Sequence, residues 1–193
     1  MKKILFILFI LILSFGQKIN AETINQIYEG NIDAKVTIIA YESLTCSHCA
    51  DFHENVYPDL KKEFIDTGLV KMEFRHFPLD LAALNASKIA QCKNDGKSDL
   101  LHFLFLNQKK WVKGETVEDI NKNLKKLLKD ENIDIDFEKC INDKRIEDYV
   151  LNDRIEAVKK FKLNATPTII INNEKFDKAL NFKNLKKSIE KLI

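Results

Sequence analysis

The chain has 193 residues, of which 45% are hydrophobic and 31% charged, and its 31 basic residues nearly balance 29 acidic ones. This length suits one domain with a buried core. The near-neutral charge excludes strong electrostatic attraction to nucleic acid or to a membrane surface, so we expect no nucleic-acid partner.

Residues 1–21 have the three-part plan of a secretory signal. Lys2 and a second lysine precede an unbroken apolar run over Ile4–Leu13, and the small residues Ser14, Gly16 and Ala21 occur after it. The run is shorter than the ~20 apolar residues that cross a bilayer. We therefore predict a signal peptide over 1–21, removed on export to the periplasm or outside the cell. An uncleaved signal that remains as a membrane anchor is the alternative.

Two cysteines separated by two residues follow the first long strand. The β-branched run Val36–Tyr41 predicts a buried strand, and Ala50–Phe64 predicts a helix. Cys46 and Cys49 lie between them, one helical turn apart and on one face, so their sulfurs come within disulfide reach. This arrangement predicts a reversible redox-active disulfide and thiol-disulfide exchange.

The helix start favours Cys46 as the nucleophile. Free backbone N–H groups and the positive end of the helix dipole favour a thiolate at the first cysteine and lower its pKa. A protonated His48 adds positive charge between the two thiols, and Ser47 occupies the other intervening position. Stabilising the thiolate stabilises the reduced form and makes the disulfide more oxidising.

The competing interpretation of the two cysteines is a structural zinc site, because Cys-x-x-Cys is also half of many four-ligand clusters. His48 and His53 lie close by, but Cys92 and Cys140 stand singly and far apart. No second ligand pair has the spacing of a closed zinc site, so we expect neither a metal nor an organic cofactor.

The second strand is predicted over Leu69–Phe77, which completes a βαβ unit. A helical pattern then extends to about residue 162, with helices expected at the ranges 81–92, 99–108, 116–129 and 145–161. Cys92 and Cys140 both fall in this helical insertion. An even cysteine count in an exported protein favours a structural disulfide between them over two free buried thiols.

The chain returns to strands near its end. Thr168–Ile171 predicts a buried strand, residues 172–173 a turn, residues 175–176 a short strand, and Phe182–Leu192 an amphipathic helix. The predicted order is therefore βαβ, a block of helices, and ββα.

This order and its motifs resemble the DsbA-like branch of the thioredoxin superfamily. The resemblance rests on the Cys-x-His-Cys motif after the first long strand, on the helical insertion and on Ala165–Thr168 before the late strand. It implies an α/β thioredoxin fold formed by residues 22–79 and 162–193, with 80–161 as a helical insertion beside the active site. The resemblance covers essentially the whole chain after the predicted signal.

The resemblance also implies that Pro167 follows a cis peptide bond and faces the redox pair. The backbone of Thr166 would then pair with an extended substrate segment, which recognises main chain rather than particular side chains. On its own, Thr-Pro before a strand indicates an ordinary trans bond. Two positions depart from the best-known oxidase pattern: Ser47 stands where proline is frequent, and Thr166 resembles the residue of isomerase relatives.

Glu42, four residues before Cys46, is a candidate proton relay for Cys49; a solvated acid at a strand end is the alternative. His53, His76 and His102 lack a matching set of metal ligands and are expected to be core or surface histidines.

Our first functional hypothesis is a monomeric, exported dithiol oxidase that introduces disulfides into cysteine-containing proteins and is reoxidised by a membrane partner, as the resemblance implies. The second is an isomerase or reductase kept reduced by a membrane electron donor, which Thr166 supports. Isomerase relatives carry an N-terminal dimerisation region. The segment between the predicted signal peptide and the first long strand is too short to form such a region. The third hypothesis is a non-catalytic binding protein or metal carrier.

Overall fold

The computed structural model describes residues 23–193, so the predicted signal peptide at 1–21 lies outside the described residues. Five strands form one mixed sheet with the spatial order β1-β3-β2-β4-β5. Their bounds are β1 Ile27–Gly30, β2 Val36–Glu42, β3 Val70–His76, β4 Thr168–Ile171 and β5 Glu174–Lys175. Strands β2 and β3 are parallel, whereas β1 is antiparallel to β3 and β4 is antiparallel to β2.

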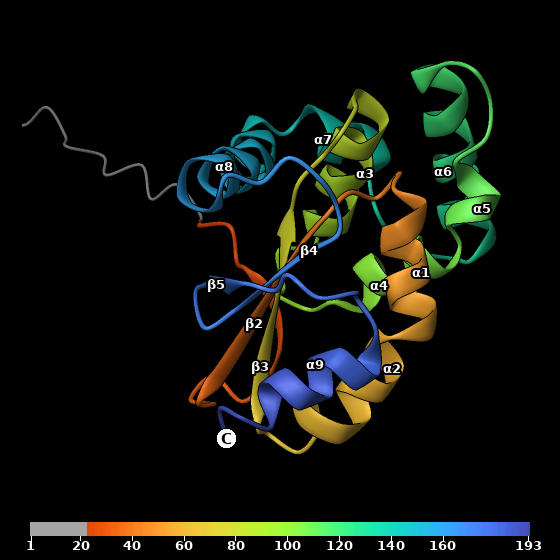
Figure 1. Cartoon of the computed structure of the whole chain (residues 1–193). Coiled ribbons are helices and arrows are strands. Elements are labelled where there is room, and N and C mark those ends of the chain that lie inside the picture. The colour runs from red at the N-terminus through yellow and green to blue at the C-terminus, as the bar shows by residue number, and fades with distance from the viewer. Residues whose placement is uncertain (1–22) are drawn as a thin grey trace, which may run out of the picture.

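Helices and helical turns account for most of the remaining chain. Their bounds are α1 Ser47–Asn55, α2 Tyr57–Leu60, a π-helical turn Lys61–Ile65, α3 Leu81–Gln91, α4 Asp99–Leu106, α5 Gln108–Trp111, α6 Val117–Asp130, α7 Phe137–Asn142, α8 Lys144–Phe161 and α9 Phe182–Ile189. In Figure 1, α1, α2 and α9 lie on one side of the sheet and α8 crosses its other side near the top. None of the helices described over 23–193 is long and apolar enough to cross a membrane.

The two faces of the sheet explain why the central strands are apolar along their whole length. On β2, Ile38 belongs to the core cluster that includes α1 and α9, whereas Tyr41 belongs to the cluster formed with Ala157 of α8. Successive strand residues point to opposite faces, so a strand covered on both sides needs apolar residues at nearly every position. The run at β4 follows the same rule, because Ile170 faces α8 while its two neighbours face the larger cluster.

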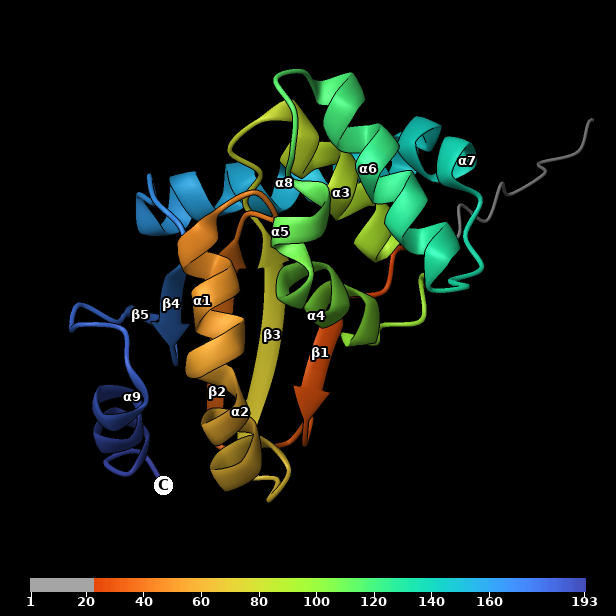
Figure 2. The same ribbon diagram turned by 90° about the vertical axis from the view of Figure 1, so that its right-hand side faces the viewer.

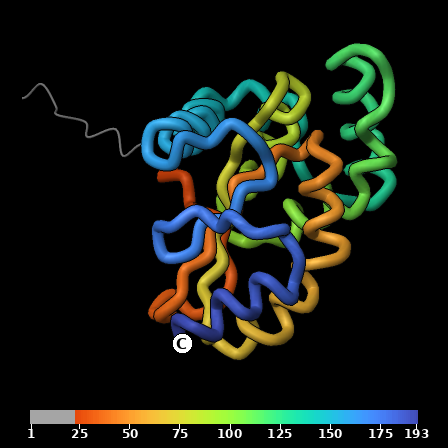
Figure 3. The backbone as a smooth tube through the Cα atoms, in the orientation of Figure 1, coloured from red at the N-terminus to blue at the C-terminus, as the bar shows by residue number. Residues whose placement is uncertain are grey.

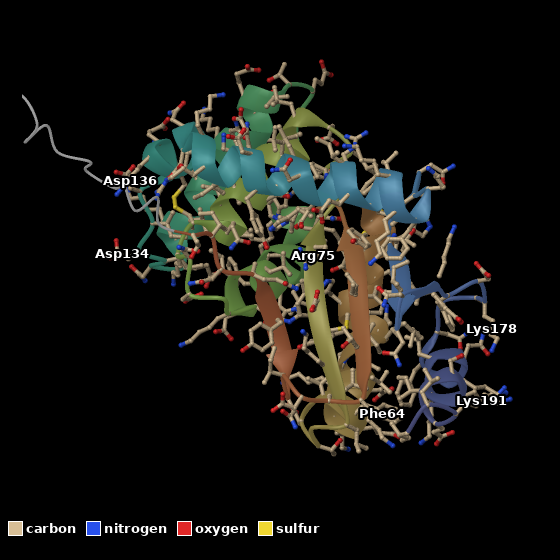
Figure 4. The ribbon with its side chains drawn as sticks, turned by 90° about the vertical axis from the view of Figure 1, so that its left-hand side faces the viewer. Phe64, Arg75, Asp134, Asp136, Lys178 and Lys191 are labelled. Carbon is tan, nitrogen blue, oxygen red and sulfur yellow. A yellow bond between two sulfur atoms is a disulfide. The ribbon has the colours of Figure 1, made fainter. Side chains whose placement is uncertain are left out.

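The segment from α3 to α8 enters between β3 and β4, which is the helical insertion that the sequence predicted. Figure 2 shows most of it above the sheet, with α4 beside α1. A disulfide joins Cys92, at the end of α3, to Cys140 in α7. This is the pairing that the cysteine count favoured, and Figure 4 shows it as a yellow bond near Asp136.

Strand β3 is tied to α8 across the other face of the sheet. Arg75 donates to the carboxylate of Asp153 at 3.0 Å, and the same carboxylate accepts the backbone N–H of His76 at 3.0 Å. Arg75 is labelled in Figure 4, where it lies between β3 and α8. Asp153 is almost completely buried.

The prediction of one helix over 50–64 was wrong in its bounds. The first helix begins at Ser47 and ends at Asn55, and a short helix and a π-helical turn follow. The interruption at Val56 (φ −120°, ψ −46°) comes just before Pro58, whose ring removes an N–H donor from the helical ladder. The early start of α1 places Cys46 at its N-cap and Cys49 inside it.

Three further elements were not predicted, namely the edge strand β1 and the short helices α5 and α7. Strand β1 has four residues, of which only Ile27 is buried, so its hydrophobic pattern is weak. Helices α5 and α7 have four and six residues, too few for a periodic pattern to develop.

Candidate redox site

The N-terminus of α1 presents the two cysteines at different depths. The backbone N–H groups of Cys49 and Ala50 donate to the Cys46 carbonyl at 3.1 and 3.2 Å, which closes the first turn of the helix. Cys46 is half-buried, whereas Cys49 has no exposed surface. Both are free thiols in this structure. Because Cys49 is buried, only Cys46 is accessible to a partner sulfur.

The loop before β4 meets Cys46, although 120 positions separate them in sequence. The Thr166–Pro167 peptide bond is cis, and the Cys46 thiol donates to the Thr166 carbonyl with a sulfur-to-oxygen distance of 3.4 Å. Figure 3 shows this late segment of the chain passing beside the start of α1. The redox pair and the residues that the resemblance assigned to substrate binding are therefore adjacent in space.

Hydrogen bonds stabilise the Cys46 thiolate. A hydrogen bond from Cys49 has the largest effect, ahead of the opposing effect of burial, and the pKa of Cys46 is lowered to about 5. Thr166 and the backbone N–H groups of Cys49 and His48 lower this pKa further. The hydroxyl of Thr166 is buried and has no other hydrogen-bond partner in the described part of the chain, so it can donate to the Cys46 thiolate.

The pKa of Cys49 moves in the opposite direction. Burial raises it far above the ordinary range of a thiol, and its hydrogen bond with Cys46 and the charge of Glu42 add to this effect. At neutral pH the pair therefore consists of one accessible thiolate and one buried thiol. This division separates a nucleophile from a group that must lose its proton before it can react.

Glu42 is buried at the end of β2, so its interpretation as a solvated acid at a strand end was wrong. Both of its carboxylate oxygens contact Nε2 of His53, at 3.1 and 3.0 Å. The charge of Glu42 contributes to the raised pKa of Cys49, and the role of Glu42 as a proton relay remains a prediction.

The side chains of Ser47 and His48 are exposed. The contribution of His48 to the lowered pKa of Cys46 comes from its backbone N–H. Tuning of the thiolate by the imidazole remains a prediction.

Gln108 on α5 is a site residue that sequence reasoning missed. Its buried side-chain amide donates to the carbonyls of Leu44 and Cys46, at 2.8 and 3.0 Å. It thereby fixes the turn that leads into the first cysteine. No local pattern indicates this role, because Gln108 lies 64 positions after Leu44 and in a helix too short to predict.

The predicted histidines are distributed between the core and its edge. His53 and His76 are buried, and His102 is partly buried beside His53. Across residues 23–193, no group of three or more His, Cys, Asp or Glu side chains is arranged to hold a metal ion.

The five-stranded mixed sheet carries a Cys-x-x-Cys motif at the start of α1, and the cis peptide bond before Pro167 lies in the loop whose Thr166 carbonyl contacts the first sulfur. Together these features define a thioredoxin fold. The sequence model of the family described as Thioredoxin matches residues 22–191 of this chain. The chain belongs to the thioredoxin family, as a DsbA-like member.

Solved structures agree with this assignment. Wolbachia pipientis alpha-DsbA1 is similar with a TM-score of 0.77 and 33% identity, over 87% of this chain and 90% of that one. BdbD from Bacillus subtilis gives a TM-score of 0.70 at 25% identity, over 86% of this chain and 91% of that one.

Among curated proteins, a Rickettsia bellii protein named "Putative protein-disulfide oxidoreductase" is 30% identical over 152 residues, which are 77% of this chain and 57% of that protein. The chain thus spans little more than half the length of this relative. "Disulfide bond formation protein D" of Bacillus subtilis is 28% identical over 172 residues, 84% of this chain and 74% of that protein.

Proposed function

We propose that the protein is a thiol-disulfide oxidoreductase that introduces disulfides into exported proteins through Cys46 and Cys49. The observation that carries this proposal is the unequal burial of two free thiols at the start of α1, with Cys46 half-buried and Cys49 fully buried. In agreement with it, the pKa of Cys46 is lowered to about 5 and that of Cys49 is raised. A stabilised Cys46 thiolate favours the reduced pair and so makes its disulfide a good oxidant.

The reaction begins with the Cys46–Cys49 disulfide. A substrate thiolate attacks Sγ of Cys46 because this sulfur is the accessible one, and Cys49 leaves as a thiolate that takes up a proton. The second substrate thiolate then attacks the substrate sulfur of the mixed disulfide. Cys46 leaves as its stabilised thiolate, the substrate gains a disulfide, and the enzyme is left reduced by two electrons.

The cis-proline loop supplies the substrate-binding surface in this proposal. The backbone of Thr166 lies against Cys46 and before Pro167, where an extended substrate segment can pair with it beside the reacting sulfur. Recognition of main chain would accommodate many cysteine-containing substrates. Export, a membrane partner that reoxidises the protein and a monomeric state belong to the same proposal and follow from the resemblance and the predicted signal peptide.

A second candidate is a reductase or isomerase, which the threonine before the cis-proline favours. The equilibrium reduction potential of the Cys46–Cys49 pair in defined glutathione buffers separates the two. A potential more oxidising than that of glutathione supports the oxidase. A strongly reducing potential contradicts it and assigns the pair as an electron donor to other disulfides.

A further inference from the structure

A continuous line of contacting polar side chains, buried at its inner end and partly exposed at its outer end, leads away from the redox pair. Glu42 at the end of β2 contacts Nε2 of His53 on α1, and Nδ1 of His53 lies 2.7 Å from Nδ1 of His102 on α4. Nε2 of His102 in turn lies 2.8 Å from Oε1 of Glu29 on β1. Three consecutive contacts therefore join four titratable side chains from four elements; α1 and α4, which carry the two histidines, lie side by side in Figure 2.

The two ends of this line differ in their surroundings. At the inner end, Glu42 is buried and its charge acts on the buried Cys49 thiol. At the outer end, Glu29 and His102 line a surface cavity of about 570 Å³, together with Tyr57 and Lys61. None of the residues 46–49 or 166–167 lines this cavity. The line thus connects the underside of the redox pair with solvent at a second surface.

Each contact in the line needs one shared proton, because two lone pairs cannot form a hydrogen bond with each other. Two neutral imidazoles supply two protons for three contacts, so the complete line holds a third. Burial lowers the pKa of His102, and hydrogen bonds from His102, Ser98 and Tyr57 hold the pKa of Glu29 far below its ordinary value despite its burial. The third proton therefore belongs to the inner half, on His53 or Glu42.

We propose that Glu42, His53, His102 and Glu29 form a proton relay that carries the Cys49 proton to the cavity when Cys49 attacks a mixed disulfide at Cys46. The proposal rests on the proposed function. It extends the role predicted for Glu42 by giving that proton a route to solvent, and it assigns positioning roles to three residues that do not touch the sulfurs.

The relay balances when the third proton starts on His53, whose Nε2–H faces the Glu42 carboxylate. Cys49 gives its proton to this carboxylate, and the other Glu42 oxygen keeps the hydrogen bond from His53 Nε2. His53 Nδ1 passes a proton to His102 Nδ1, and His102 Nε2 passes one to Glu29, which releases it to water in the cavity. The Cys49 thiolate then bonds to Sγ of Cys46, and the partner sulfur leaves with the electron pair of the broken bond.

The test follows the reaction of the reduced protein with oxidised glutathione, stopped by alkylation at successive times and analysed by mass spectrometry. The first step, attack by Cys46, appears as glutathionylated protein, and the second, attack by Cys49, as its disappearance. In His102→Gln, which keeps a polar side chain but no titratable nitrogen, we expect the second step to slow by on the order of tenfold or more. The first step should remain within a factor of about two, because general acid–base transfer through the relay does not serve it.

His76→Gln is the matched control, because His76 is also buried at a strand end but contacts Gln91 rather than the relay. It should leave both steps near their wild-type rates. In His102→Ala, dissolved imidazole should accelerate the second step, because His102 borders both the large cavity and a second cavity of about 300 Å³ that also reaches His53. Chemical rescue of this kind does not repair a purely structural defect.

A selective slowing of the second step that imidazole reverses supports the relay. An unchanged second step in His102→Gln overturns it, and so does an equal slowing of both steps without rescue. A wild-type protein that forms no glutathionylated intermediate and no Cys46–Cys49 disulfide would instead overturn the proposed function, and the relay with it.

Discussion

The thiol of Cys46 lies 3.4 Å from the carbonyl oxygen of Thr166, across 120 residues of sequence. A helical insertion separates the two halves of the fold along the chain, yet the sheet returns β4 to the side of β2 and brings the two residues together. The reactivity of the first cysteine is therefore a property of the assembled fold as well as of its local motif.

Replacing Cys49 with alanine should raise the pKa of Cys46. The hydrogen bond from Cys49 is the largest of the effects that hold this pKa at about 5. The thiolate absorbance of Cys49→Ala, followed against pH, should show its midpoint shifted upward toward the ordinary thiol value. Cys46→Ser provides the baseline, since its remaining Cys49 thiol should show no transition at acidic or neutral pH. A midpoint that stays near 5 in Cys49→Ala would contradict the assignment.

The reduction potential should depend on pH with two slopes. Above pH 5 the reduced pair holds one thiolate and one thiol, so one proton accompanies two electrons and the potential should fall by about 30 mV per pH unit. Below pH 5 Cys46 is protonated in the reduced form, two protons are taken up, and the slope should approach about 59 mV. Glutathione equilibria measured across this range locate the break. A single slope of about 59 mV through neutral pH would show that Cys46 is an ordinary thiol.

Gln108→Leu should destabilise the protein and alter the Cys46 turn. The substitution leaves two carbonyl groups, of Leu44 and Cys46, without their donor, and a buried polar group without a partner costs about 1–3 kcal/mol. Urea unfolding measures this loss, and the alkylation rate of Cys46 reports on the turn. Gln108→Glu serves as a comparison, since it is similar in shape but can donate neither bond when ionised. Unchanged stability in both variants would contradict the role assigned to the two hydrogen bonds of Gln108.

Removal of the second disulfide should lower stability without abolishing thiol exchange. Cys92 and Cys140 are 48 positions apart, and in the chain-entropy description closing a loop of this length contributes about 4 kcal/mol. The double variant Cys92→Ala/Cys140→Ala should therefore unfold at lower denaturant concentration. Loss of Cys46 reactivity in the folded double variant would show that this disulfide does more than restrain the insertion.

Arg75→Met should cost about 3 kcal/mol or more, because it leaves the buried Asp153 carboxylate without its cation. Adding Asp153→Leu should recover part of that loss, although the backbone N–H of His76 then loses its acceptor. Unfolding free energies of the two single variants and the double variant give the coupling between the residues. Additive losses would show that the pair is not energetically coupled.

The sequence predicted the parts of this molecule that have strong local signals. The apolar runs at β2 and β4 are readable because both faces of the sheet are covered, and the two redox cysteines are identified by spacing alone. Strand β1 was missed because pairing with β3, rather than its own composition, holds it in place. Its absence from the prediction also hid the place of Glu29.

The polar contacts of the site could not be derived from sequence. His53 and His102 are 49 positions apart, and their contact depends on the packing of α1 against α4. Each histidine was correctly expected to be a core or surface residue, but that expectation contained no information about which partner it had. The burial of Glu42 is likewise a result of the helices that cover the end of β2.

Because the two sulfurs are buried to different depths, a reagent can modify one of them without the other. A mild alkylating reagent at neutral pH should modify Cys46 and leave Cys49 intact, since only Cys46 is partly exposed and has a lowered pKa. In a Cys49→Ser variant, a cysteine of a captured protein would remain bound to Cys46 because no second sulfur can release it. The Cys49→Ser variant can therefore be used to trap the substrates of the protein as mixed disulfides, which can then be isolated and identified.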